Sequence, residues 1–217
     1  MYQRRFKAGI LILLFLILVV SCINPIYPRE MYLQHSATIV VAAFLIYSAF
    51  KNNLSNKSFV LIAVFTVFHI IGARWIYSYT PYDQWIKSIT GISINSWFGF
   101  ERNQYDRLIH FLFGFLILIP LQELFQRMPG LTWKTSLLMA LLTILSLSTL
   151  YEVFEWMLSI VLSPEDAELY NGQQGDFWDA QKDMALAFVG SLCMLFIIYI
   201  LHFIRRNDKH KRFDVLK

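Results

Sequence analysis

Residues 184–204 read MALAFVGSLCMLFIIYILHFI, an unbroken apolar run that contains no Asp, Glu, Lys or Arg. A helix needs about 20 mostly apolar residues to cross the hydrocarbon core of a bilayer. Inside that core, an α-helix satisfies the hydrogen bonds of its own backbone. The run therefore predicts a transmembrane helix.

Similar apolar runs recur along the rest of the chain, separated by short polar stretches. They cover residues 8–23, 33–50, 59–77, 107–125 and 135–162. With 57% hydrophobic and only 16% charged residues, the chain is too apolar for an ordinary soluble domain. We therefore predict an all-α polytopic membrane protein of six transmembrane helices that form a single domain over residues 1–217.

The basic residues predict the direction of the helices, because Lys and Arg accumulate on the cytoplasmic side. With both termini inside, the inner segments contain thirteen of the 19 basic residues. These are Arg4, Arg5, Lys7, Lys51, Lys57, Arg127, Lys134, Arg205, Arg206, Lys209, Lys211, Arg212 and Lys217. We therefore expect both termini in the cytoplasm, with residues 78–104 and 163–178 outside.

The composition also bears on other classes of protein. The net charge of +4 comes from basic residues beside the apolar runs, so we expect no nucleic-acid partner. Cys22 and Cys193 both fall in apolar runs, which indicates neither a disulfide framework nor a thiolate metal site. An alternative for the first run is a signal peptide that ends at a lipid-modified Cys22, which would leave five spans.

Three short segments carry most of the polar residues that are unusual for a membrane protein. They are YDRLIH at 105–110, YEVFEW at 151–156 and GDFWDAQKD at 175–183. Residues three or four apart share a helical face. This spacing pairs Asp106 with His110, Glu152 with Glu155, and Asp179 with Asp183.

The expected directions bring the three segments to one depth. The fourth and sixth spans begin outside, so their acids lie at the outer mouth. Glu152 follows Thr135 by seventeen residues, or about 25 Å along a helix that runs outward. A charge at the bilayer centre costs about 2.5–3.5 kcal/mol, so carboxylates near this level need partners, protons, water or a cation.

The residue types fit more than one chemistry. Carboxylates with one imidazole suit a divalent cation such as Mg²⁺, Mn²⁺ or Zn²⁺. The candidate ligands are Asp106, His110, Glu152, Glu155 and Asp183. A crowded carboxylate pair beside His110 also suits general acid–base catalysis. The third interpretation is a structural salt-bridge network in which Arg74, Arg107 and Lys182 neutralise the acids.

Two further residues have simpler interpretations. Asp176 follows Gly175 before the sixth span, which is typical of a helix cap. His69 lies near the middle of the third span, where a hydrogen bond between helices is the expected role. Gly114, Ala187 and Gly190 are small residues at positions of expected close helix packing.

At 105–114, 151–156 and 175–190 the chain resembles the YjdF-like inner membrane proteins, a bacterial family of unknown function. The six-span layout fits as well, so the resemblance covers most of the chain. It implies a location in the bacterial inner membrane and gives no reaction.

The chain is also distantly similar to the VanZ-like membrane proteins, which are associated with glycopeptide resistance. Asp106, His110, Glu152, Asp183 and Gly190 match that pattern. Arg107 stands where the pattern has Lys, Glu155 where it has Gln, and Ala187 where it has Asn, so this site is more acidic. The link to cell-envelope chemistry is an analogy of fold.

These observations lead to a first hypothesis and two alternatives. The first is an outward-facing site of Asp106, His110, Glu152, Glu155, Asp179 and Asp183 that binds, or acts on, an envelope or lipid-linked molecule with the help of a divalent cation. The alternatives are a proton- or cation-coupled transporter and a structural or assembly protein held by ion pairs. No catalytic motif is present, so the sequence leaves open whether the protein is an enzyme.

Overall fold

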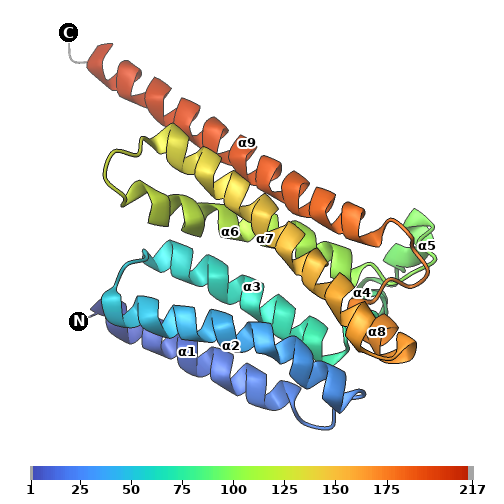
Figure 1. Ribbon diagram of the computed structural model, residues 1–217. Helices are drawn as coiled ribbons and strands as arrows, with labels where there is room; N and C mark the ends of the chain where they lie inside the picture. The colour runs from blue at the N-terminus through green and yellow to red at the C-terminus, as the bar shows by residue number, and fades with distance from the viewer. Residues whose placement is uncertain (1, 215–217) are drawn as a thin grey trace.

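The computed structural model describes the backbone of residues 2–214 and the side chains of residues 3–204, and this part of the chain is helical with no strand. The helices are α1 (Tyr2–Ser21), α2 (Pro28–Lys51), α3 (Asn56–Arg74), α4 (Tyr82–Thr90), α5 (Ile94–Phe98), α6 (Tyr105–Gln126), α7 (Trp133–Val161), α8 (Pro164–Asn171) and α9 (Asp179–Asp214). Six of them are long and run side by side, and the other three are short (Figure 1). The predicted all-α class is confirmed.

Five helices are long and apolar enough to cross a membrane. They are α2, α3, α6, α7 and the segment Asp179–Ile204 of α9. Helix α1 has 20 residues, but Arg4, Arg5 and Lys7 lie so close together near its start that every 18-residue stretch of the helix contains all three. The basic residues from Arg205 onward have side chains outside the described part of the chain.

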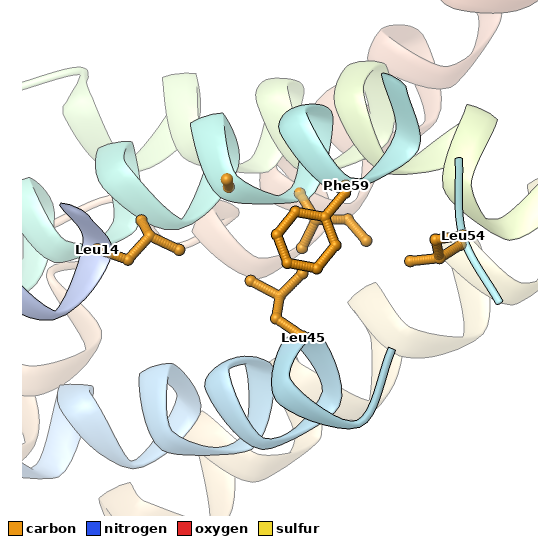
Figure 2. Packing of buried hydrophobic residues seen from close by; sticks show 6 residues of the cluster. Leu14, Leu45, Leu54 and Phe59 are labelled. Carbon is orange, nitrogen blue, oxygen red and sulfur yellow. The ribbon is translucent and has the colours of Figure 1, made fainter. Parts of the chain in front are cut away.

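Helix α6 lies at the centre of the bundle, where it packs against α3, α7 and α9. Helices α1 and α2 pack on α3, and a buried cluster of Leu14, Leu45, Leu54 and Phe59 joins these three helices and the loop that follows α2 (Figure 2). Both termini lie at one end of the bundle, and α4, α5 and α8 lie at the other (Figure 1). We call the end with the two termini the terminal end of the bundle, and the end with the three short helices the capped end.

Helix α3 ends at Arg74, before the end of the apolar run that predicted it. Ile76 and Tyr77 both have positive φ, at 42° and 57°, and this reverses the chain. Such conformations are strained for residues other than Gly and occur preferentially at functional sites. The reversal carries the Tyr77 ring back over Gly72, where an added Cβ would lie 2.7 Å from the ring.

The closest helix packing is between α6 and α9, at the glycines that the sequence marked for it. A Cβ on Gly114 would overlap the carbonyl of Ala187 and lie 2.9 Å from the Ser191 nitrogen. A Cβ on Gly190 would overlap the Phe111 carbonyl and lie 3.0 Å from the Phe115 nitrogen. The predicted role of both glycines in close packing is confirmed.

We expect Gly114→Ala to destabilise the protein by about 1–3 kcal/mol, the usual range for an overpacked contact, because α6 and α9 must move apart. Thermal unfolding of the detergent-purified protein measures this. Gly9→Ala in α1 is the matched control, since no atom lies within 4 Å of its added Cβ. Equal melting temperatures for the two variants would contradict the close contact.

Candidate functional site

The predicted site residues come from three helices that meet near the capped end of the bundle (Figure 1). Asp106 and His110 lie in the first two turns of α6, and Asp179 and Asp183 lie in the first two turns of α9. Glu152 and Glu155 lie in the second half of α7. The structure divides these residues into two layers of different chemistry.

The deeper layer, which we call the acidic cluster, contains Asp106, His110, Glu152 and Asp183. One ligand atom from each of Asp106, His110 and Asp183 can be chosen so that all three lie within 4.8 Å of one another. His110 Nε2 lies 3.6 Å from Glu152 Oε1 and 3.8 Å from Asp106 Oδ1. His110, Glu152 and Asp183 are buried, so the cluster is shielded from bulk water.

The acidic cluster contains carboxylate oxygens that lack partners. Glu152 Oε1 and Asp183 Oδ1 make no hydrogen bond within the described residues, although Glu152 is 7% exposed and Asp183 is 2% exposed. In the part of the chain with described side chains, no Lys or Arg forms an ion pair with any carboxylate of the cluster. Buried carboxylates in this state require a proton or a bound cation.

The outer layer, which we call the ion-pair layer, contains Asp176, Asp179, Arg102, Arg107 and Lys182. Arg102 Nη1 lies 2.5 Å from Asp179 Oδ1 and 3.7 Å from Asp176 Oδ2. Arg107 pairs with Asp176 and lies 3.4 Å from Asp179, and Lys182 Nζ lies 2.5 Å from Asp176 Oδ2. Asp179 thus has cationic partners, in contrast to the other carboxylates of the site predicted from the sequence.

The observed ion pairs differ in two details from the salt-bridge network predicted from the sequence. Arg107 and Lys182 do bind acids, but those acids are Asp176 and Asp179 rather than the acidic cluster. Arg74 binds no acid within the described residues, and it donates instead to the carbonyls of Ser21 and Ile23, each at 2.7 Å. The ion-pair layer contains Arg102 in place of Arg74, although the sequence had not indicated a role for Arg102.

Asp176 is both the predicted capping residue and the centre of the ion-pair layer. Its Oδ1 accepts the backbone N–H of Trp178 at 3.0 Å, just before α9 begins. Its Oδ2 accepts from Lys182 and Arg107. The hydrogen bond from Lys182 is the largest of the effects that lower the pKa of Asp176 from 3.8 to about 2.

Glu155 lies to one side of the acidic cluster. Together with Glu152, Asn171, Gln173 and Asp179 it lines a polar cavity of about 110 Å³ between α7, α8 and the start of α9. The carbonyl of Glu155 accepts a hydrogen bond from Asn171 Nδ2 at 3.2 Å. Glu155 therefore belongs to the wall of a small polar cavity that reaches the cluster through Glu152.

A larger cavity reaches the cluster from the other side. It has a volume of about 190 Å³ and is lined by α2, α3, α6 and α7, mostly with apolar side chains. Asp106 and His110 form part of its wall, so the cavity and the cluster share these two residues. The acidic cluster thus lies between an apolar cavity and a polar one.

The apolar cavity also contains polar residues whose role the sequence did not reveal. His69 Nδ1 is hydrogen-bonded to the Tyr77 hydroxyl, a partner in the turn after its own helix rather than in another helix. Ser148 Oγ is buried in the wall and makes no hydrogen bond to any described residue. Ser148 lies four residues before Glu152 and therefore shares its helical face.

Comparisons with known proteins identify the family. The profile of the family described as "Predicted membrane protein (DUF2238)" matches residues 6–203. The chain belongs to this family. Inner membrane protein YjdF of Escherichia coli (strain K12) is 27% identical over 173 residues, which is 78% of each chain. No solved structure matches the chain.

The comparisons confirm two expectations from the sequence. The resemblance to YjdF-like proteins is confirmed by the family profile and by the E. coli relative. Together with the long apolar helices, they show that the chain is a multi-pass protein of the inner membrane. The family description contains no reaction, so the chemistry of the site rests on its geometry.

The low pKa of Asp176 predicts a specific dependence of stability on pH. Because the folded value lies below the ordinary 3.8, the stabilisation is complete above about pH 4 and is lost as pH falls toward 2. Asp176→Asn should therefore lower the melting temperature at pH 5 and have a smaller effect near pH 2.5. Thermal unfolding of the purified protein over this range measures the difference.

Asp166→Asn is the control for this measurement, because Asp166 pairs only with the exposed Arg29 among the described residues. A surface ion pair of this kind contributes little. If both variants shift the melting temperature equally at every pH, the ion-pair layer does not stabilise the fold in the way described.

Proposed function

We propose that this protein holds a divalent cation in the acidic cluster, on the outward side of the inner membrane, and uses it to bind an envelope or lipid-linked molecule. The observation that carries the proposal is the group of carboxylates without basic partners around His110. Three ligand atoms from two helices already lie within 4.8 Å of one another. Two buried carboxylate oxygens lack any hydrogen bond within the described residues.

The topology in this proposal has six spans with both termini in the cytoplasm, and α1 is the sixth. Helix α1 packs along α3 and α2 as part of the bundle. Lys7 is fully buried, and its Nζ donates to Asn52 Oδ1 at 2.7 Å and to the Leu54 carbonyl at 2.6 Å. This contact fixes the terminal end of α1 to the loop after α2. It favours α1 as a lasting span over a signal peptide.

Reporter fusions test this topology. A reporter active only in the cytoplasm should work when fused after Lys217 or inserted between α6 and α7, and should fail when inserted between α7 and α8. A reporter active only outside should give the reverse pattern. An outside signal at the C-terminus would overturn both the six-span arrangement and the outward direction of the acidic cluster.

The cation in the proposal has defined ligands. Ligands about 2.0–2.2 Å from a common ion lie no more than about 4.4 Å from one another, so Asp106, His110 and Asp183 need only small side-chain movements. Two ionised aspartates balance the charge of a divalent cation. Glu152, 3.6 Å from His110 Nε2, is placed to complete the shell or to exchange a proton with the imidazole.

Metal content tests the cation directly. We expect the purified protein to contain close to one divalent ion per chain, measured by elemental analysis after dialysis against Mg²⁺, Mn²⁺ or Zn²⁺. Asp183→Asn and the double variant Glu152→Ala, Asp183→Ala should lose it. Glu165→Gln, an exposed acid at the start of α8, is the control and should retain it.

The outcome also separates the proposal from a structural role. If neither the natural protein nor the control binds metal and Asp183→Asn only changes stability, the cluster is structural and the proposal fails.

A transporter would need a charged path to the other side of the membrane. Glu123, the acid at the terminal end of α6, is occupied by hydrogen bonds from Ser55 and Ser58 and by an ion pair with Arg127.

A further inference from the structure

The apolar cavity has the properties of a binding site for a hydrocarbon chain. Most of its wall surface is apolar, and Ala37 and Val41 of α2, Phe65 of α3, Phe113 of α6 and Leu147 of α7 contribute to it. Its volume of about 190 Å³ exceeds the roughly 150 Å³ of an apolar protein cavity that admits benzene. It is therefore large enough for the first few carbons of a chain, with the remainder outside.

Two of the helices that line the cavity, α2 and α7, do not pack closely against each other over the described residues. Both are membrane-spanning helices with exposed apolar faces. A chain that leaves the cavity between α2 and α7 enters lipid rather than water.

Several polar side chains also line the cavity. Asp106 and His110 are shared with the acidic cluster, and the buried Ser148 Oγ and His69 Nε2 in the wall have no hydrogen-bond partner within the described residues. His69 is oriented by its hydrogen bond to Tyr77, which the strained turn at Ile76 and Tyr77 puts in place. The unpartnered atoms of Ser148 and His69 and the strained turn are observations independent of those that define the acidic cluster.

We propose that the ligand of this site is a single-chain lipid phosphate, such as an isoprenyl or alkyl monophosphate. Its chain occupies the apolar cavity and continues between α2 and α7 into the bilayer. Its phosphate binds the cation held by Asp106, His110 and Asp183. This inference rests on the proposed cation site and names the class of molecule that the site takes.

Phosphate is the headgroup that the surrounding residues favour. A hard cation bound by one or two carboxylates commonly completes its shell with water and substrate phosphate. Above the cluster, Arg102 and Arg107 each have a buried Nε without a hydrogen-bond partner among the described residues. The small polar cavity beside Glu152 gives room for the part of the headgroup that faces the outer side.

The experiment uses farnesyl monophosphate as the probe, with inorganic phosphate as the chainless comparison. Binding to the detergent-purified full chain is measured by calorimetry with Mg²⁺ and again with EDTA. We expect farnesyl phosphate to bind at least tenfold more tightly than inorganic phosphate in the presence of Mg²⁺. Ala37→Phe, which fills the cavity, should weaken farnesyl phosphate at least tenfold and leave the metal content unchanged.

Ala43→Phe is the matched control, because it adds the same ring to an exposed position of the same helix. It should change neither affinity nor metal content. Equal affinity for farnesyl phosphate and inorganic phosphate, or unchanged binding in Ala37→Phe, overturns the inference even if metal binds. If binding depends on Ala37 but persists in EDTA, the site for the hydrocarbon chain is supported and the cation is rejected. Failure of the lipid inference and failure of the cation proposal are therefore distinguishable.

A second measurement does not depend on the folding of any variant. A farnesyl phosphate analogue with a photoreactive group on its chain is irradiated with the natural protein, and the adducts are mapped by mass spectrometry. Adducts on half-buried cavity-lining residues such as Val41, Phe65 and Phe113 support the inference. Adducts confined to lipid-exposed residues such as Ile39 and Val40 reject it.

Discussion

The contact between α6 and α9 sets the geometry on which the candidate site depends. Gly114 lies one turn below His110, and Ala187 lies one turn below Asp183, so the backbone contact between Gly114 and Ala187 is directly beneath the facing pair. Because no side chain separates the two backbones there, His110 and Asp183 are brought within ligand distance of one another. If the two helices were further apart, each of these ionisable side chains would lie in an apolar bundle without a polar partner. The cost of burying a charge there would favour a neutral residue at each position.

The separation of charge into two layers gives the acidic cluster its chemical character. In the outer layer, Arg102 and Arg107 pair with both Asp176 and Asp179, and Lys182 pairs with Asp176. Carbonyls of Gly172 and Gln173 also accept from Arg102, each at 3.0 Å, which ties the α8–α9 loop to the segment before α6. Among the described side chains, none of these cations forms an ion pair with the deeper carboxylates, and His110 is the only basic side chain within ion-pair distance of them.

Much of the fold could be predicted from the sequence, because bilayer thickness determines the length of the apolar runs and helical spacing determines which polar residues share a face. This reasoning identified the members of the acidic cluster. It could not separate Asp179 from Asp183, since both share one face of α9 and only the loop that holds Arg102 distinguishes them. Nor could it identify the partner of His69, because that contact depends on positive φ angles at Ile76 and Tyr77, which the sequence does not indicate.

The strained turn after α3 has a physical explanation if the apolar cavity is kept open for a ligand. Continuing α3 as a helix would relieve the unfavourable backbone at Ile76, a β-branched residue for which positive φ is especially uncommon. The turn instead places the Tyr77 ring against Gly72 and its hydroxyl on His69, in the wall of the cavity that Ser148 and Tyr151 of α7 also line. Strain of this kind persists only where the surrounding contacts outweigh it. Here those contacts shape a cavity wall in which His69 Nε2 and Ser148 Oγ are buried without a hydrogen-bond partner among the described residues, an arrangement that a purely structural helix junction would not require.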